Sequence, residues 1–253
     1  MPTKIAIPEP TFSDAKYNGR TLPLYMAALQ AFGAFPVIIS LREAPDVVAR
    51  LVTGTQGVLL PGSCFDVDPE CYGQRRIPEC GPADPARTAV DELLLQDAFN
   101  LRKPILAICH GFQALNVWLN GSLIQDIDAI LHSGVNHRSD REVMDAHSIR
   151  IAPGSLLQKS LANHTGQFDA TVNSSHHQAL GRVGDRLQVT AVSPEDDVIE
   201  AAELTSSDHF VLGVQWHPER TFTLNELSSG IFEAFVRAVE NWKPIPERMA
   251  QSR

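Results

Sequence analysis

One cysteine stands where the residue pattern changes from a strand to a helix. The apolar, β-branched run Ile105–Ile108 predicts a buried central strand, and the apolar spacing from Phe112 onward predicts a helix. Cys109 falls between them, and Gly111 lets the backbone turn closely. The sulfur would lie at a helix N-terminus, where the dipole and free N–H groups favour a thiolate. The pattern therefore indicates a nucleophile or, as the alternative interpretation, a small side chain that fills the core.

A histidine and a glutamate after another buried strand could activate this thiol. The apolar run 211–216 leads directly into His217-Pro218-Glu219. Alternate side chains of an extended backbone share a face, so His217 and Glu219 can point the same way. Glu219 would hold one ring nitrogen and leave the other facing Cys109. Because a thiol that attacks a carbonyl needs a base and the base needs an orienting group, the sequence predicts a Cys109–His217–Glu219 triad.

The elements that must position these residues alternate between strand and helix. Short apolar runs predict strands at 4–7, 35–41, 57–61, 105–108 and 211–216, and helical patterns cover 22–32, 45–51, 85–100 and 224–242. This alternation is typical of an α/β fold with a parallel sheet. Strands at 149–151, 187–192 and 198–202 predict a smaller antiparallel region. We expect one domain over residues 1–253, with its core at about 4–242, and a charged tail after Pro246 that frays.

A long segment rich in proline, glycine and cysteine, residues 64–84, follows one predicted strand. Loops of this length are uncommon and usually functional. It leaves the carboxyl end of a strand, where ligands bind in such sheets, so we expect it to form a wall of a substrate pocket. A disordered surface insert is the alternative interpretation.

The composition excludes several function classes. The chain has 253 residues, 43% of them hydrophobic and 20% charged, with a formal net charge of −9, which argues against binding to nucleic acid through its phosphates. No apolar run is long enough for a signal peptide core or a membrane span, so we expect a cytoplasmic protein that does not bind membranes. A homodimer is compatible with the sequence.

The cysteine and histidine spacings do not predict a metal site. The four cysteines form no C-x-x-C pair, and we expect them to remain thiols, although the sequence leaves a disulfide among Cys64, Cys71 and Cys80 open. The irregular spacing of His132, His137 and His147, without a nearby carboxylate pattern, favours solvated or hydrogen-bonded histidines over metal ligands.

Three sequence blocks resemble the class I glutamine amidotransferase superfamily, and most closely its stand-alone γ-glutamyl-γ-aminobutyrate hydrolase family. They are Cys109-His110-Gly111-Phe112-Gln113, Asn173-Ser174-Ser175-His176-His177-Gln178 and Gly213-Val214-Gln215-Trp216-His217-Pro218-Glu219. Leu59-Leu60-Pro61-Gly62-Ser63 also resembles the family's strand and glycine turn, and the resemblance runs from about residue 5 to 242.

The resemblance implies a three-layer αβα sandwich and a cysteine hydrolase that cleaves a small γ-glutamyl compound through a γ-glutamyl thioester, without a metal or other cofactor. It implies that the triad is carried by Cys109, His217 and Glu219. The oxyanion donors would be the backbone N–H groups of Ser63 and His110. The residues implied to contact substrate are Gly62, Gln113, Ser174, Ser175, His176 and His177.

The same residues are compatible with two other functions. A glutaminase component would deliver ammonia to a separate synthase, and a non-catalytic binding protein would use the fold without turnover. The chain also departs from the family pattern. It has Gly62-Ser63 in place of two glycines, His110 where many relatives have arginine, and Thr88 where an acidic residue is usual. None of these departures removes a residue of the predicted triad. They mean that the identity of the amine leaving group stays open.

Overall fold

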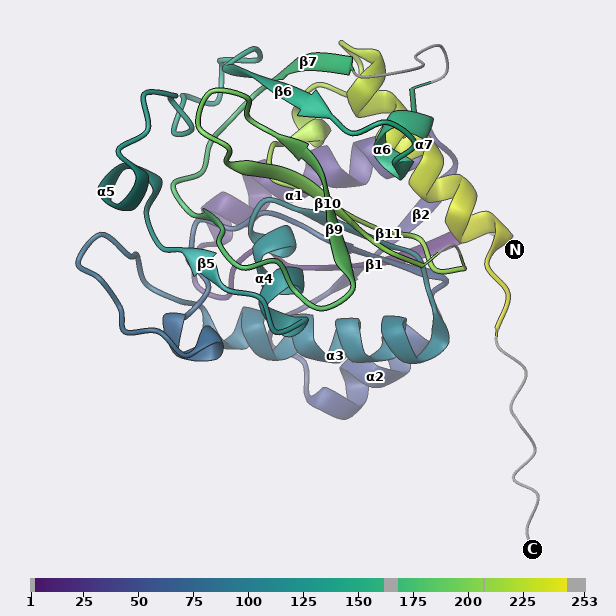
Figure 1. Cartoon of the computed structure of the whole chain (residues 1–253). Coiled ribbons are helices and arrows are strands. Elements are labelled where there is room, and N and C mark those ends of the chain that lie inside the picture. Colours follow the sequence, from purple (N-terminus) through teal and green to yellow (C-terminus); the bar gives the residue numbers. More distant parts are fainter. Residues whose placement is uncertain (1–2, 162–167, 207, 245–253) are drawn as a thin grey trace, which may run out of the picture.

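A mixed β-sheet forms the centre of the molecule (Figure 1). The computed structural model describes residues 3–161, 168–206 and 208–244, and within them nine strands pair in the order β2-β1-β3-β4-β11-β10-β9-β6-β7. The first five in this order run parallel: β2 (Ala34–Ile39), β1 (Thr3–Pro8), β3 (Gly57–Leu60), β4 (Ile105–Ile108) and β11 (Val211–Val214). The other four pair antiparallel: β10 (Ile199–Leu204), β9 (Leu187–Val192), β6 (His147–Ile151) and β7 (Phe168–Val172).

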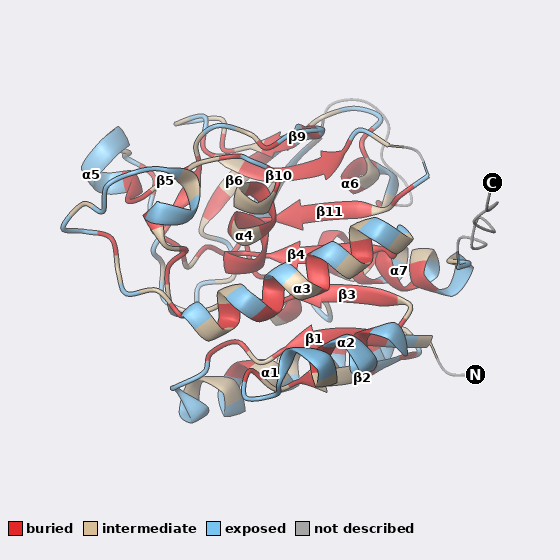
Figure 2. Cartoon of the chain, turned by 90° about the horizontal axis from the view of Figure 1, so that it is seen from below, coloured by how far each residue is buried: buried red, intermediate tan, exposed pale blue. Residues whose placement is uncertain are grey.

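Helices cover both faces of this sheet, which makes the three layers that were predicted. One core layer contains apolar side chains of α1 (Ala15–Ala31), α6 (Leu156–Lys159) and α7 (Glu226–Asn241). The other contains those of α2 (Pro45–Thr53), α3 (Pro85–Leu101) and α4 (His110–Trp118). In Figure 2 the central strands are coloured as buried, whereas α3, which crosses in front of them, also carries exposed residues on its outer side. The fold class predicted from the sequence is confirmed.

Most predicted elements lie within a few residues of their observed bounds, but some short or weakly patterned ones were missed. α1 begins at Ala15 rather than at residue 22, because the side chain of Asp14 accepts a hydrogen bond from the Tyr17 N–H and caps a first stretch that carries no apolar stripe. The missed elements are β7, α6, α5 (Ile127–Leu131) and the small sheet of β5 (Leu123–Ile124) with β8 (Ala179–Leu180). The predicted fraying of the tail concerns residues outside the described part.

The 64–84 segment is an ordered wall, so the interpretation as a disordered insert is wrong. It contains the 3-10 helix η1 (Pro69–Tyr72) and a bridge between Asp66 and Ala83. Gln125 accepts a hydrogen bond from the Ile77 N–H and donates to the carbonyl of Arg75, which fixes the outer part of the loop against the neighbouring chain segment. All four cysteines are free thiols, so no disulfide contributes to this order.

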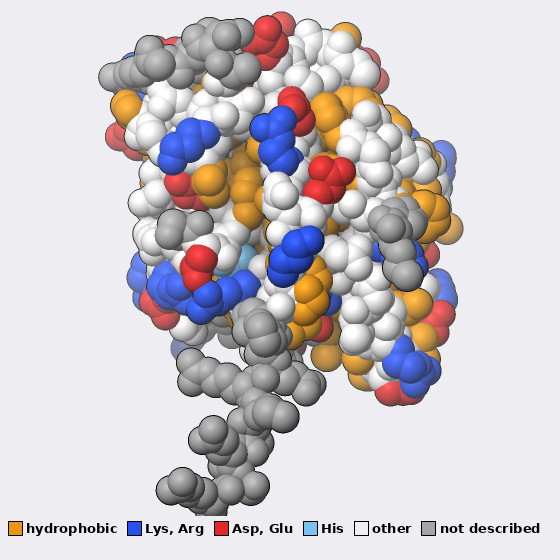
Figure 3. Space-filling view, turned by 90° about the vertical axis from the view of Figure 1, so that its right-hand side faces the viewer, with side chains coloured by type: hydrophobic (Ala, Val, Ile, Leu, Met, Phe, Trp, Pro, Cys, Tyr) orange, Lys and Arg blue, Asp and Glu red, His pale blue; other side chains and the backbone are white. Residues whose placement is uncertain are grey.

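Figure 3 draws one face of the molecule, and basic and acidic side chains of the described residues both lie on it. Among the described residues, no helix has both the length and the apolar character needed to cross a membrane.

Candidate active site

Three neighbouring parallel strands bring the predicted chemistry to one edge of the sheet. β4 pairs with β3 on one side and with β11 on the other. Cys109 follows β4, Ser63 lies shortly after β3, and His217 lies shortly after β11. Because parallel strands end at the same edge, residues far apart in the sequence meet there.

Cys109 occupies a sharp turn between β4 and α4. Its φ of 51° and ψ of −110° lie outside the helical and strand regions, a strained conformation for a residue with a side chain. Its N–H donates to the Val214 carbonyl at 2.8 Å, and its carbonyl accepts from the Gln113 N–H at 3.0 Å. The turn also requires Gly111, because a Cβ there would lie 2.3 Å from the Leu60 carbonyl oxygen. The predicted cysteine elbow is therefore present.

His217 and Glu219 form a buried pair. His217 Nδ1 lies 2.8 Å from Glu219 Oε1, and both side chains are buried. A carboxylate accepts the Nδ1–H, which leaves Nε2 as the basic nitrogen. The extended backbone predicted here is wrong, because Pro218 starts the 3-10 helix η2 (Pro218–Arg220). The two side chains meet nonetheless, across a single tight turn.

The imidazole of His217 and the Cβ of Cys109 both lie close to Gly62. A Cβ on Gly62 would lie 2.9 Å from His217 Cε1 and 3.5 Å from Cys109 Cβ, so a side chain at this position would fill the space between them. Within the described part of the chain, no hydrogen bond joins the Cys109 thiol to the His217 ring. Catalytic hydrogen bonds in unliganded enzymes are often long and shorten when substrate binds, so this geometry is compatible with proton transfer between the two.

Burial favours the protonated form of Cys109. Burial raises the pKa of the Cys109 thiol to about 12, and the positive charge of Arg220 and the N–H of His110 offset this only in part. Burial also lowers the pKa of His217, although the Glu219 carboxylate opposes that shift. The raised pKa of the thiol and the lowered pKa of the imidazole both favour the neutral forms, which is opposite to the thiolate expected at this helix N-terminus.

The two residues predicted to supply oxyanion donors, Ser63 and His110, line the same pocket as Cys109. The Gly62 N–H is already used, since it donates to the Tyr25 hydroxyl oxygen at 3.0 Å. The next N–H, that of Ser63, makes no hydrogen bond within the described part of the chain, and the His110 N–H faces the Cys109 sulfur. Their role as oxyanion donors stays a prediction.

A pocket of about 190 Å³ opens in front of Cys109. Seven of the predicted site residues line it, namely Ser63, Cys109, His110, Gln113, Ser175, His176 and His177. Gly62 lies behind Cys109 instead, and Ser174 is fully buried with its hydroxyl donating to the His137 carbonyl. The 64–84 segment contributes Cys64, Phe65 and Asp66, so it forms a wall of the pocket as predicted.

Two of the pocket residues are already held by protein groups. His177 lies 2.9 Å from Asp66 and 3.0 Å from Asp126, and hydrogen bonds to these carboxylates raise its pKa. This pair of contacts ties the 64–84 segment to the start of α5. Gln113 donates its amide N–H groups to the Gln178 carbonyl and to the Gln215 side chain. Both residues therefore shape the pocket wall as well as facing it.

Sequence reasoning missed four residues that support this site. Asn173 bonds both the N–H and the carbonyl of His217, each at 2.9 Å, and Arg220 donates to Ser175 and lies 3.8 Å from Glu219. Arg138 lines the pocket, and Tyr25 holds Gly62. Asn173 is the first residue of one recognised block and Arg220 directly follows another, a signal that could have found them, whereas no pattern singles out Arg138 or Tyr25.

Known proteins are similar to this chain over most of its length. A family model described as peptidase C26 matches residues 7–219. The γ-glutamyl-γ-aminobutyrate hydrolase of Escherichia coli K12 is 33% identical over 225 residues, which cover 86% of this chain and 85% of that protein. A provisionally named glutamine amidotransferase of Mycobacterium tuberculosis is 38% identical over 220 residues, covering 86% of this chain and 67% of that protein.

A solved structure supports the fold. A protein of Thermoplasma acidophilum, provisionally described as one component of a GMP synthase, superposes with a TM-score of 0.63 and covers 95% of each chain. Its sequence identity to this chain is 14%, so it bears on the architecture alone.

Proposed function

The chain belongs to the peptidase C26 family of class I glutamine amidotransferase-like proteins, and we propose that it hydrolyses the γ-glutamyl amide bond of a small γ-glutamyl compound. Cys109 is the nucleophile, His217 the base and acid, and Glu219 the group that orients the imidazole. The observation that supports this proposal is a strained cysteine elbow that opens on a pocket, with the buried His217–Glu219 pair close to the neighbouring Gly62. Relatives named as γ-glutamyl-γ-aminobutyrate hydrolases support the hydrolase class and the γ-glutamyl specificity.

The proposed reaction starts from the neutral thiol and imidazole. As the Cys109 sulfur attacks the γ-carbonyl carbon, its proton moves to His217 Nε2, and the carbonyl oxygen becomes an oxyanion beside the Ser63 and His110 N–H groups. His217 then gives the proton to the leaving nitrogen, the C–N bond breaks, and a γ-glutamyl thioester and a free amine result. Glu219 stabilises the imidazolium that forms between the two transfers.

Water completes the cycle at the same residues. His217 takes a proton from a water molecule, whose oxygen attacks the thioester carbon. The C–S bond breaks, the proton passes to the sulfur, and glutamate leaves. Each step uses a group that the pocket already holds, so the proposal needs no cofactor.

The pocket suits the glutamyl half of the substrate. Its volume of about 190 Å³ is small, and its lining is rich in polar side chains. The guanidinium of Arg138 forms no ion pair with a described residue, and we assign it to the α-carboxylate of the glutamyl group. The 64–84 segment would border the amine that leaves, since it lines the pocket next to Ser63.

Turnover assays with thioester trapping test this function. Purified protein is given γ-glutamyl-γ-aminobutyrate, a chromogenic γ-glutamyl anilide and glutamine, and intact-mass spectrometry follows the acyl-enzyme. We expect glutamate release and a γ-glutamyl adduct on Cys109, both absent in Cys109→Ala. Cys64→Ala, which changes an exposed cysteine at the rim of the same pocket, is the matched control and should keep activity.

Other outcomes would assign the chain to a different class. Ammonia release from glutamine only after a synthase protein is added would identify a glutaminase component. Binding of γ-glutamyl compounds without turnover or adduct would contradict the hydrolase and leave a binding protein.

A further inference from the structure

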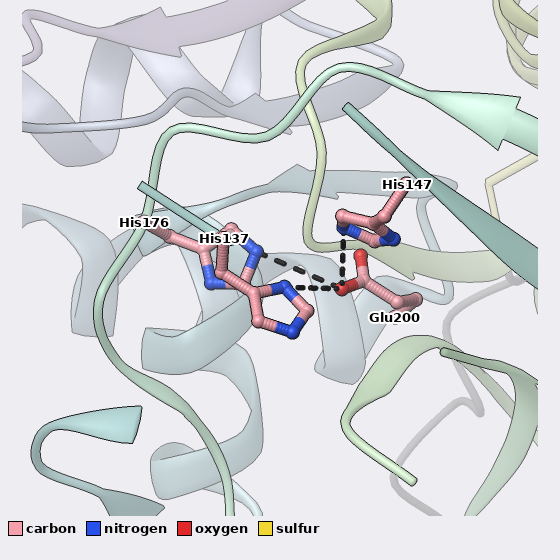
Figure 4. A group of neighbouring side chains, drawn as sticks. All are labelled: His137, His147, His176 and Glu200. Carbon is pink, nitrogen blue, oxygen red and sulfur yellow. Dashed lines mark ion pairs between the residues drawn. The ribbon is translucent and has the colours of Figure 1, made fainter. Parts of the chain in front are cut away.

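Four buried polar side chains converge beside the pocket (Figure 4). His137 comes from the loop after α5, His147 from β6, His176 from the loop before β8 and Glu200 from β10. Glu200 Oε1 lies 3.4 Å from His137 Nδ1, 3.4 Å from His147 Nε2 and 3.7 Å from His176 Nε2. None of these four facing atoms makes a hydrogen bond with a described residue. Buried polar atoms without partners are costly, so this cluster calls for an explanation.

The ring nitrogen of each imidazole that points away from Glu200 makes a hydrogen bond, and this bond defines where the lone pair of the ring lies. His147 Nδ1 lies 3.1 Å from the carbonyl oxygen of the next residue, and His176 Nδ1 lies 3.0 Å from the Gln178 carbonyl oxygen. His137 Nε2 lies 2.9 Å from the Asp196 carboxylate. All three partners only accept hydrogen bonds, so these nitrogens carry the protons. In each neutral ring the lone pair then points inward, toward the Glu200 carboxylate, an arrangement that repels unless a metal ion or an added proton lies within it.

We propose that His137, His147, His176 and Glu200 bind one divalent transition-metal ion, with zinc as the best match. Tetrahedral zinc with bonds of about 2.0–2.1 Å places its ligand atoms about 3.4 Å apart. The three distances from Glu200 Oε1 agree with this value, and all four ligand atoms lie within 4.8 Å of one another. The remaining nitrogens need only small side-chain movements to close around an ion.

The donor set and its charge favour zinc over other common cations. Calcium and magnesium prefer oxygen ligands, whereas imidazole nitrogen suits zinc and its neighbours in the transition series. Each histidine is oriented through its second nitrogen by a carboxylate or a carbonyl, as is usual for zinc ligands. The two negative charges of Glu200 and Asp196 would balance the two positive charges of the ion.

Four protein ligands leave no open position, so the ion would have a structural role. It would join β6, β10 and the loops that carry His137 and His176. The His176 N–H already donates to the His137 carbonyl at 2.9 Å, and His176 lines the substrate pocket. The ion would therefore hold the pocket wall in place without taking part in proton transfer. This site does not depend on the proposed hydrolase function.

Metal analysis of the full chain tests the site directly. The experiment uses the Cys109→Ala protein, because the thiol of Cys109 beside His217 could itself bind zinc. The protein is equilibrated with zinc, dialysed against metal-free buffer and measured by mass spectrometry of the elements. We expect one zinc ion per chain, retained when His132→Gln is added and lost when Glu200→Gln or His147→Gln is added. His132 is the matched control, since it is an exposed histidine outside the cluster.

A second measurement keeps the test valid if a ligand variant fails to fold. Cobalt replaces zinc in the Cys109→Ala protein, and its visible spectrum reports the geometry of the ligands. We expect the intense bands of tetrahedral cobalt, and a melting temperature that falls with a chelator and recovers with zinc. No retained metal, no tetrahedral spectrum and a melting temperature that ignores zinc would overturn the proposal and indicate shared protons among these groups. Equal zinc retention by Glu200→Gln and His132→Gln would overturn it too.

Discussion

The neutral state of Cys109 affects how its chemistry begins. Burial raises the pKa of the thiol and lowers that of His217, and the helix N-terminus does not reverse either shift. A neutral thiol cannot attack a carbonyl efficiently, so the proton must leave as the C–S bond forms. In the proposed mechanism, His217 therefore acts as a general base in the first step, and a preformed thiolate is not needed.

Alkylation of the free protein tests the state of this thiol. With iodoacetamide at neutral pH, we expect the exposed Cys64 and Cys71 to react before the buried Cys109. The rate at Cys109 should then increase about tenfold per pH unit, because the reactive thiolate stays a minor species below its raised pKa. Peptide mass spectrometry over a pH series measures each rate. Fast labelling of Cys109 first, with a rate that no longer changes above neutral pH, would contradict the neutral thiol.

The acid limb of the activity profile tests His217. Its pKa is lowered by burial, so the neutral base persists as the pH falls, and kcat/KM should decrease only below the usual histidine pKa of about 6.5. The Glu219 carboxylate raises this pKa, so in Glu219→Gln the limb should move to still lower pH while kcat falls by about two to four orders of magnitude. Initial rates with the γ-glutamyl anilide from about pH 4 to 9 provide the profile. A limb that moves upward in Glu219→Gln would show that the carboxylate does not act on His217.

Among the elements, the sequence predicts best those that are buried on both sides. β1, β3, β4 and β11 read as short apolar runs because helices cover both faces of the parallel half. β5, β8 and α6 are too short to show a period, so the pattern carries no signal for them. The 3-10 turn at η2 was missed because an X-Pro sequence is compatible with both an extended and a turn backbone.

The close contact between α4 and β3 predicts that one added methyl group at Gly111 destabilises the protein, whereas the same change at an uncrowded helical glycine does not. In Gly111→Ala the new Cβ would meet the Leu60 carbonyl oxygen, so we expect the free energy of unfolding to fall by more than about 2 kcal/mol. Gly19→Ala is the control, since Gly19 is also helical but has no atom within 4 Å of the added Cβ. It should stabilise the protein by up to about 1 kcal/mol. Urea unfolding compares the two, and equal effects would mean that the close approach of α4 is unimportant.

The contact between the segments that follow β7 and β11 predicts a positioning role for Asn173. Its side chain joins the N–H and carbonyl of His217, so Asn173→Ala should displace the imidazole and lower kcat by about 10- to 100-fold. KM should change little, because Asn173 does not line the pocket. Asn173→Asp keeps the hydrogen-bond acceptor and loses the donor, so its kcat should lie between that of wild type and that of Asn173→Ala. Equal kcat for wild type and Asn173→Ala would exclude this role.

Across the whole molecule, the sequence indicates candidate site residues that follow strands. It does not indicate which side chains from distant segments contact them after folding. The residues proposed as the triad could be singled out because each follows an apolar strand or lies in a recognised block. Asp66, His177 and Asp126 meet from three separate segments, and no spacing indicates it. The same is true of Glu200, whose position on β10 places a carboxylate among histidines for which the spacing showed none.

Substitution of Arg87 should have a large effect on the free energy of unfolding. It is fully buried in α3, pairs with Asp91 at 2.8 Å and donates to the carbonyls of Pro10 and Pro61. Arg87→Met leaves the Asp91 charge without its partner, so we expect a loss of about 3–5 kcal/mol in the free energy of unfolding. Adding Asp91→Leu should recover part of it.

A matched surface pair separates this effect from ordinary ion pairing. Arg50 pairs with Asp46 at the same spacing on α2, but both side chains are exposed. Arg50→Met should change the free energy of unfolding by no more than about 0.5 kcal/mol. Similar losses for both arginine variants in urea titrations would contradict the argument from burial.

The 64–84 segment also bears on how this scaffold diversifies. The proposed reacting groups follow β4 and β11, whereas most of this segment lies outside the sheet and adds only one side of the cavity. Exchange of residues 67–80 between relatives, with the Asp66 anchor retained, should therefore redirect amine preference while the bond-breaking apparatus stays untouched. Sequence changes in this segment during evolution could alter the preferred amine in the same way, without disturbing the packing of the core.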